Sequence, residues 1–211
     1  MRIKVCGMTQ INQVKELDEM GIDFAGFIFY PKSPRYVGRH LQGATLKKTR
    51  LRLGKVGVFV HPTYEEVMKQ VDEFGLDMVQ LHGDETTRFC EQVANYVTVI
   101  KVFRLAENDP IDWIIRPYED CCDMFLFDTL GVGYGGTGKK FNWDILKTTS
   151  LDKLFFLSGG IEPEDAAKLK EFAKEPVARK LFSIDINSKF ELEPGIKDMG
   201  KIRKMLEDLR S

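Results

Sequence analysis

Eight short segments rich in β-branched and aromatic residues recur along this chain, and several are apolar without interruption. The clearest are VGVFV at 56–60, MFLF at 124–127 and LFFL at 154–157. A strand with one face in water alternates apolar and polar residues, whereas a strand buried on both faces is apolar throughout. The pattern therefore predicts a parallel sheet covered on both faces, with strands at 3–6, 23–29, 55–60, 77–81, 97–103, 123–128, 154–158 and 181–186.

Segments with helical periodicity and with start and stop signals lie between these strands. Thr9 is expected to cap the first helix, and Gly21 is expected to end it in a left-handed conformation. Thr63 and Glu66 have the spacing of a capping box. The chain therefore alternates strand and helix from its first residues to its last.

The number of alternating units predicts how the sheet is organised. Strand starts recur at intervals of about 20 to 30 residues, the length of one strand-plus-helix unit, and no Pro-rich or Ser-rich linker divides the units. Eight units without a boundary predict an α/β fold, a single-domain (β/α)8 TIM barrel spanning residues 1–211. A doubly wound open sheet is the alternative, but it commonly has five to seven strands and one ligand crevice.

Glycine and polar residues gather where the predicted strands end, which is where (β/α)8 barrels place their active sites. Gly159 and Gly160 follow the seventh strand, and Asn187 and Ser188 follow the eighth. Open backbone N–H groups and these side chains predict a phosphate site between the two loops. The alternative for the glycine pair is a tight turn without a ligand.

A second glycine-rich segment, GVGYGGTG at 131–138, follows the sixth strand. Its glycines match the spacing of a dinucleotide-binding motif. They lie several residues past their strand, however, so the match to a dinucleotide-binding site is weak. We interpret the segment, with Gly135 and Gly136, as a mobile cover over the site. A plain flexible loop is the alternative.

Three side chains at strand ends are candidates for chemistry. Asp128 closes an apolar strand, where low-dielectric surroundings would raise its pKa toward values useful to an acid catalyst, unless it forms an ion pair or caps the loop. Arg35 lies in a loop held by two prolines, Pro31 and Pro34, which favours a bidentate grip on a carboxylate over a solvated surface position. Cys6 ends the first strand, where a buried free cysteine is commonly a small hydrophobic residue.

Composition excludes several other functions. The 31 Lys and Arg against 32 Asp and Glu give a net charge of −1, which argues against a nucleic-acid binder or an anionic membrane surface as partner. The start holds no signal-peptide core and no apolar run is long enough to span a membrane, so we expect a cytoplasmic protein with four free thiols. His82 could be a ligand, an acid or a spacer, and together with His61 it lacks the spacing of a metal site.

Several longer motifs resemble one enzyme family. They are KVCGMT, GFIFYPKSPRYV, VGVFV, VQLHGDE, IKVFRL, LFDT followed by YGGTGKKFNWDIL, LSGGIEPEDA and SIDINSKFE. In this order, and over nearly the whole chain, they are similar to the phosphoribosylanthranilate isomerases, the small (β/α)8 enzymes of tryptophan biosynthesis. The order of VCG, YPKSPR, QLHG and YGGTG is far more specific than any single motif.

The resemblance implies an Amadori rearrangement of N-(5-phosphoribosyl)anthranilate to 1-(2-carboxyphenylamino)-1-deoxyribulose 5-phosphate, with no cofactor. It implies that Cys6 is the general base, Asp128 the general acid and Arg35 the holder of the anthranilate carboxylate. The glycine pairs and Asn187-Ser188 would contact the substrate and its phosphate, and His82 would touch the substrate or its neighbours. A Cys6 thiolate would serve once its pKa falls below about 8.5, through a helix N-terminus at Thr9 or the charge of an iminium intermediate.

One residue departs from the family pattern. Lys189 stands where the family usually has glycine after the serine of the last loop. Lysine does not readily adopt positive φ, so we expect a different loop shape, or an ammonium group that adds to phosphate binding, and we leave Lys189 out of the expected site.

Three rival functions have recognisable sequence marks. The histidine-pathway aminoaldose isomerase uses two aspartates at strand ends, whereas Cys6 ends the first strand here. Indoleglycerol-phosphate synthase needs a catalytic lysine and glutamate and usually an N-terminal extension. A barrel that binds the metabolite without turnover would lack the acid–base pair. We expect a monomer whose partner is a small phosphosugar.

Overall fold

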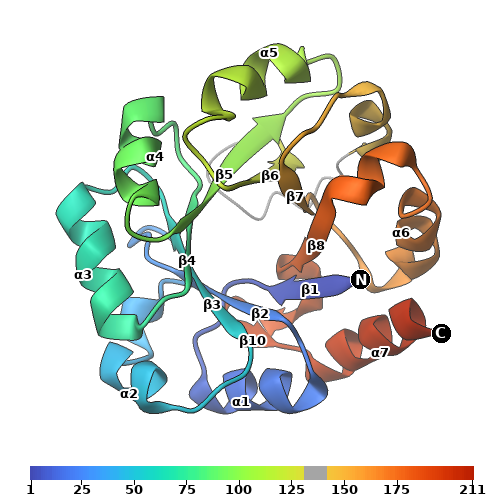
Figure 1. The fold of residues 1–211 in the computed structure, drawn as a ribbon. Coiled ribbons are helices and arrows are strands. Elements are labelled where there is room, and N and C mark those ends of the chain that lie inside the picture. Colours follow the sequence, from blue (N-terminus) through green and yellow to red (C-terminus); the bar gives the residue numbers. More distant parts are fainter. Residues whose placement is uncertain (131–141) are drawn as a thin grey trace.

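The computed structural model describes residues 1–130 and 142–211. Eight parallel strands hydrogen-bond in sequence order, and β1 also pairs with β8, so the sheet closes into a barrel surrounded by helices (Figure 1). The strands are β1 (Arg2–Val5), β2 (Phe24–Ile28), β3 (Gly54–Phe59), β4 (Met78–Leu81), β5 (Thr98–Leu105), β6 (Met124–Thr129), β7 (Leu154–Leu157) and β8 (Leu181–Ile186). The predicted barrel is confirmed, and the open-sheet alternative is wrong.

Helices cover the outer face of the barrel. The α-helices are α1 (Ile11–Met20), α2 (Gly43–Lys48), α3 (Tyr64–Phe74), α4 (Thr87–Ala94), α5 (Ile111–Ile115), α6 (Ala166–Phe172) and α7 (Met199–Arg210). The short 3-10 helices are η1 (Val37–Arg39), η2 (Arg116–Tyr118), η3 (Trp143–Thr148), η4 (Pro163–Asp165), η5 (Pro176–Lys180) and η6 (Ser188–Phe190). In the described ranges, no helix is both long and apolar enough to cross a membrane.

Of the sequence signals at helix ends, two are confirmed by the structure and one is wrong. Thr63 and Glu66 form the predicted capping box, with side-chain hydrogen bonds of 3.2 and 2.7 Å to each other's backbone N–H groups. Gly21 ends α1 with a φ of 75°, as predicted. The cap predicted at Thr9 is wrong, because α1 begins after Gln10 and the Thr9 hydroxyl instead donates a 2.6 Å hydrogen bond to the Gly195 carbonyl.

The barrel interior changes character along its axis. Its amino-terminal part is filled by an apolar cluster, Phe24, Val56, Ile100, Val102, Met124, Leu126 and Phe156. Side chains two residues apart on a strand share a face, so the positions that follow in the same rows also point inward. These include Lys4 on β1, Cys6 directly after β1, Arg104 on β5 and Asp128 on β6. The carboxyl-terminal part of the interior is therefore polar.

A small antiparallel hairpin, which was not predicted from the sequence, follows β8. Its strands are β9 (Glu191–Glu193) and β10 (Ile196–Lys197), joined through Gly195 with a φ of 88°. The hairpin brings Glu191 and Lys197 to the barrel mouth, where both side chains are buried.

Candidate active site

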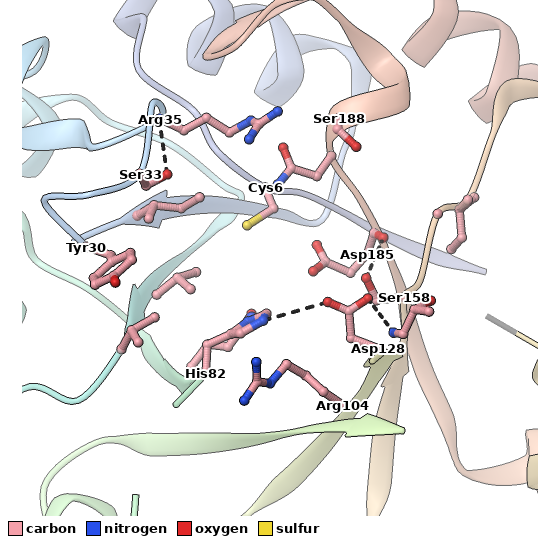
Figure 2. Close-up of a pocket in the computed structure, with 18 of the residues that line it drawn as sticks. Cys6, Tyr30, Ser33, Arg35, His82, Arg104, Asp128, Ser158, Asp185 and Ser188 are labelled. Atoms are coloured by element: carbon pink, nitrogen blue, oxygen red, sulfur yellow. Dashed lines mark hydrogen bonds and ion pairs between the residues drawn. The ribbon is translucent and has the colours of Figure 1, made fainter. Parts of the chain in front are cut away.

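A pocket of about 280 Å³ opens at the carboxyl ends of the strands. Most of the residues that the sequence analysis selected line it: Cys6, Arg35, His82, Asp128, Gly160, Asn187 and Ser188. Gly159 precedes the lining residue Gly160 but does not itself line the pocket, whereas Gly135 and Gly136 lie outside the described residues. Figure 2 shows that the labelled side chains reach the pocket from different sides, and they come from strand ends and from the connections that follow them.

Asp128 stands at the carboxyl end of β6 and is mostly buried. Its Oδ1 accepts a 2.8 Å hydrogen bond from the Thr129 N–H, which orients the carboxyl group. Burial raises the pKa of Asp128 from its ordinary 3.8 to about 6, and the nearby carboxylate of Asp185 adds to the rise. The positive charges of Lys4 and Arg104 oppose it. Asp128 therefore exchanges a proton close to neutral pH, as the sequence analysis expected.

His82 faces Asp128 across the pocket as a neutral imidazole. Burial, together with the positive charges of Lys4, Arg104 and Lys101, lowers the pKa of His82 to about 3. Its Nδ1 lies 3.1 Å from the side-chain nitrogen of Gln80, so the ring proton belongs on Nε2, which lies 3.7 Å from Asp128 Oδ2.

Two polar atoms of this region are buried without a partner. Neither His82 Nε2 nor Gln80 Oε1 has a hydrogen-bond partner in the part of the chain that the structure describes. A buried polar atom without a partner carries a desolvation cost of roughly 1–3 kcal/mol. Hydrogen bonds to a bound polar molecule would remove that cost, so these atoms mark a surface that favours ligand contact.

Cys6 follows β1 and is almost completely buried at the wall of the pocket. The expectation that a helix N-terminus at Thr9 lowers its pKa is wrong, because Thr9 does not cap a helix. Burial instead raises the pKa of the Cys6 thiol above its ordinary 9.0, and the charges of Lys4 and Lys197 act in the opposite direction. The free enzyme therefore holds Cys6 mainly as a thiol at neutral pH.

Close packing fixes the position of the Cys6 sulfur. A Cβ built on Gly26 of β2 would stand 2.9 Å from Cys6 Sγ, 3.1 Å from Cys6 Cα and 3.2 Å from Lys4 Cε. Carbon and sulfur atoms do not approach that closely without something moving. The glycine thus provides the space that the sulfur occupies.

Gly26→Ala is therefore expected to displace the Cys6 sulfur and to lower kcat, on the order of 10- to 100-fold for a shift approaching 1 Å. Steady-state kinetics with thermal unfolding as a check on folding measures this. Gly200→Ala, on the exposed face of α7, is the control and leaves kcat unchanged. An unaltered kcat in Gly26→Ala would mean that the sulfur can move without loss.

Arg35 already binds one carboxylate, that of Glu191 on the unpredicted hairpin. Arg35 Nε lies 2.9 and 3.0 Å from the two Glu191 oxygens, and Nη2 lies 2.6 Å from Oε2. Glu191 also accepts a 2.7 Å hydrogen bond from the buried Lys197, which in turn donates to Asn187 Oδ1 at 2.8 Å. Although burial opposes it, these cations hold the pKa of Glu191 below its usual value. The network fixes the Arg35 guanidinium at the pocket wall.

The loops after β7 and β8 form one end of the pocket. Gly159 and Gly160 have φ values of 91° and 70°, which glycine adopts readily. Lys189 lies within η6 and does not adopt the positive φ that lysine disfavours. Contrary to our expectation, Lys189 lines the pocket, where its ammonium group lies 2.8 Å from Glu162 Oε1.

Four further charged groups shape the pocket and were missed as site residues. Arg104 follows the apolar start of β5 and lines the pocket beside Asp128, its partner in the strand register. Lys4 and Asp185 form a buried ion pair with 2.9 Å between Nζ and Oδ1, and Lys197 lies behind Asn187. Arg104 could have been found, because the barrel rule places functional residues at strand ends. Lys4 lies in the alternating segment RIKV, which resembles a half-exposed strand, so no signal marked it as buried.

Comparisons with known proteins point to one family. The family model described as "N-(5'phosphoribosyl)anthranilate (PRA) isomerase" matches residues 3–208. An N-(5'-phosphoribosyl)anthranilate isomerase of Parabacteroides distasonis is 40% identical over 212 residues, which cover 99% of this chain and 93% of the relative.

Solved structures agree with the sequence comparison. The phosphoribosyl anthranilate isomerase of Thermotoga maritima matches with a TM-score of 0.85 and 30% identity, covering 100% of this chain and 98% of its own. Another phosphoribosyl anthranilate isomerase, solved with reduced 1-(o-carboxyphenylamino)-1-deoxyribulose 5-phosphate, matches with a TM-score of 0.80 and 27% identity over 100% of this chain and 98% of its own. By its sequence and its barrel, this chain belongs to the N-(5'-phosphoribosyl)anthranilate isomerase family.

Proposed function

We propose that this chain isomerises N-(5'-phosphoribosyl)anthranilate to 1-(2-carboxyphenylamino)-1-deoxyribulose 5-phosphate in tryptophan biosynthesis, with Asp128 as general acid and Cys6 as general base. Family membership supports the reaction. The observation that carries the residue roles is that a carboxyl group from β6 and a thiol from β1 line the same pocket.

The reaction begins with opening of the ribose ring. The protonated Asp128 carboxyl donates its proton to the ring oxygen, and the bond between that oxygen and C1′ breaks. The lone pair of the anilino nitrogen forms a C=N bond to C1′, which leaves a positive charge on nitrogen. A pKa of about 6 keeps a usable fraction of Asp128 protonated near neutral pH.

The second step removes a proton from C2′. The iminium charge acidifies this C–H bond, and the Cys6 thiolate accepts the proton. The released electron pair forms the C1′=C2′ bond and neutralises the nitrogen. The resulting enolamine gains a proton at C1′ and loses the 2′-hydroxyl proton, which gives the ketone. No redox partner is needed, because C1′ is reduced as C2′ is oxidised.

The two ends of the substrate carry negative charge and match two ends of the pocket. We assign the phosphate to the loops at Gly160 and Ser188, with the ammonium group of Lys189 at their edge. We assign the anthranilate carboxylate to Arg35, whose Nε edge is held by Glu191 and whose Nη1 edge offers further donors. Binding at both ends would hold the sugar between Cys6 and Asp128, which lowers the entropic part of the barrier.

The direct test of the function is a fluorescence assay. Purified protein is mixed with freshly prepared phosphoribosylanthranilate, and the fluorescence of this substrate is followed. Multiple turnovers per protein molecule are expected. A change that stops at one equivalent of substrate would identify a binding protein, and no change would contradict the proposal.

Arg35→Ala is expected to raise KM by roughly 10- to 100-fold, with a smaller effect on kcat. This factor corresponds to the binding free energy of a charge-assisted hydrogen bond. Steady-state kinetics in the same assay measures this. Arg39→Ala removes an exposed arginine of the same connection and is the control. An unchanged KM in Arg35→Ala would place the carboxylate on another cation, with Arg104 the next to test.

The pH dependence follows from the two shifted groups. The active form needs Asp128 protonated, with a pKa of about 6, and Cys6 ionised, with a pKa raised above 9.0. The value of kcat/KM should therefore rise with pH up to about 6, stay level, and fall once the pH passes the thiol pKa. Only a small fraction of the molecules holds both groups in the active form on the plateau, because the pKa of the acid lies below that of the thiol. A profile of kcat/KM from pH 5 to 10 with a maximum confined to pH 7 would contradict this assignment.

A further inference from the structure

Lys4 is fully buried inside the barrel, two residues before Cys6 on the same inward-facing row of β1. Its ammonium group lies 2.9 Å from Asp185 Oδ1 on the neighbouring strand β8, where the two residues are also register partners. Asp185 is itself buried and lines the pocket. A charged pair therefore occupies the barrel interior directly beneath the Cys6 sulfur.

Packing around Gly26 shows how close Lys4 comes to that sulfur. Lys4 Cε and Cys6 Sγ both crowd the position where a Cβ of Gly26 would stand, at 3.2 and 2.9 Å. These two atoms are therefore no more than about 6 Å apart. The ammonium nitrogen is one bond beyond Cε, within the range where a charge strongly affects a buried neighbour.

Stability alone does not explain a charged pair at this place. Replacing a buried ion pair with well-packed apolar residues is commonly neutral or stabilising, because both charges lose their hydration. The layer below is filled with apolar side chains such as Val56, Ile100 and Leu126, so an apolar solution was available to this barrel. An apolar residue at position 4 would remove the larger of the two positive charges that act on Cys6 and leave that of Lys197.

We propose that Lys4 is a positioning residue for Cys6, whose ammonium group stabilises the thiolate, and that the carboxylate of Asp185 partly cancels the charge of this ammonium group. The inference rests on the proposed role of Cys6 as general base. Lys4 does not touch the reacting atoms in this scheme. It acts by increasing the small fraction of Cys6 that is ionised, and hence the fraction of enzyme molecules able to take the C2′ proton.

The other charges around Cys6 support this assignment. The groups that act on the thiol are Lys4 from β1, Asp185 from β8 and Lys197 from β10. Lys197 is engaged by Glu191 at 2.7 Å, and Arg35 also binds Glu191. Burial raises the pKa of Cys6 most, and the charge of Lys4 is the largest influence that lowers it, ahead of the opposing effect of Asp185.

The test is the titration of Cys6 in the substrate-free protein. The rate of alkylation by iodoacetamide is measured from about pH 6 to 11 by mass spectrometry of the Cys6 peptide, since only the thiolate reacts. Lys4→Met is expected to reduce the thiolate fraction at a given pH at least tenfold, and to reduce kcat by a similar factor at unchanged KM. Asp185→Asn is expected to change the thiolate fraction in the opposite direction.

Opposite signs separate this proposal from a general loss of stability. Lys101→Met is the matched control, because Lys101 is also a buried lysine in an ion pair, 3.0 Å from Glu85, and is not among the charges that act on the Cys6 thiol. It should leave the Cys6 titration unchanged. Shifts of equal sign in Lys4→Met and Asp185→Asn, or no shift in either, would overturn the proposal. If Lys4→Met does not fold, the direction measured in Asp185→Asn decides.

The outcome is independent of the proposed function. Alkylation reports the ionisation of Cys6 whether or not the protein turns over substrate. A wild-type protein without isomerase activity would refute the function and leave the titration result standing. An active enzyme in which the titration of Cys6 does not depend on Lys4 would refute only the proposed effect of Lys4 on the thiolate.

Discussion

Asp128→Asn is expected to lower kcat by roughly 10²- to 10⁴-fold, the usual contribution of a general acid. Asparagine has nearly the same shape and can still accept the 2.8 Å hydrogen bond from the Thr129 N–H, but it cannot donate a proton to the ring oxygen. Substrate binding should change little, because neither charged end of the substrate is assigned to Asp128. Steady-state measurement of kcat and KM in the fluorescence assay separates the two effects.

The same substitution is expected to stabilise the protein at neutral pH. The pKa of Asp128 rises from 3.8 to about 6 on folding, so the ionised carboxylate opposes the folded state by as much as about 3 kcal/mol above pH 6. This penalty is absent below pH 3.8, where the carboxyl group is protonated in both states. The free energy of unfolding of Asp128→Asn should therefore exceed that of the wild type at pH 8 and approach it at pH 4.

Asp123→Asn is the control for both effects. Asp123 stands just before the opposite end of β6 and accepts a hydrogen bond from the Val99 N–H at 2.7 Å. Turnover should be unaffected there. If Asp128→Asn retains wild-type kcat, Asp128 is not the acid, and if it is less stable than the wild type at pH 8, its carboxylate is a structural partner instead.

Cys6→Ala is expected to reduce kcat by roughly 10²- to 10⁴-fold while KM stays close to the wild-type value. The substitution removes the sulfur that would accept the C2′ proton and leaves both anion-binding ends of the pocket intact. Ring opening by Asp128 remains possible, so substrate should still bind and slowly form the iminium. Single-turnover kinetics with substrate deuterated at C2′ would show the isotope effect of the blocked step in the wild type and its change in the variant.

Cys90→Ala is the matched control for the loss of a buried thiol. Cys90 is completely buried on α4 and does not line the pocket. The Cys90→Ala variant should be somewhat less stable than the wild type and should have the same kcat. Cys6→Ser adds a second comparison, since a hydroxyl group is too weak an acid to ionise here and should be nearly as inactive as alanine. Substantial turnover in Cys6→Ala would assign the base to another group.

The sequence predicted the barrel because its strands carry the signature of burial on both faces. The uninterrupted apolar runs at 56–60 and 124–127 do not fit a strand with one face in water. Thr63 and Glu66 mark a helix start through hydrogen bonds between residues three positions apart. Such signals need only near neighbours along the chain. The same reasoning placed the end of the sixth strand at Asp128, one residue before β6 ends in the structure.

The missed features depend on contacts between distant parts of the chain. Thr9 donates to Gly195, a contact across 186 positions that no local rule anticipates. The binding of Arg35 by Glu191 spans 156 positions and needs the hairpin after β8. The carboxylate that Arg35 binds in the structure is that of Glu191, and the binding of a substrate carboxylate by Arg35 stays a prediction.

Closure of the barrel also constrains when the protein can fold during its synthesis on the ribosome. The first strand, with Cys6 at its end, pairs with β8, whose last residue is Ile186. β1 cannot pair with β8 until nearly the entire polypeptide has emerged from the ribosome. Contacts between residues so far apart in the sequence also slow folding. Catalytic competence should thus appear late and all at once during synthesis, with truncated chains lacking the last strand remaining inert.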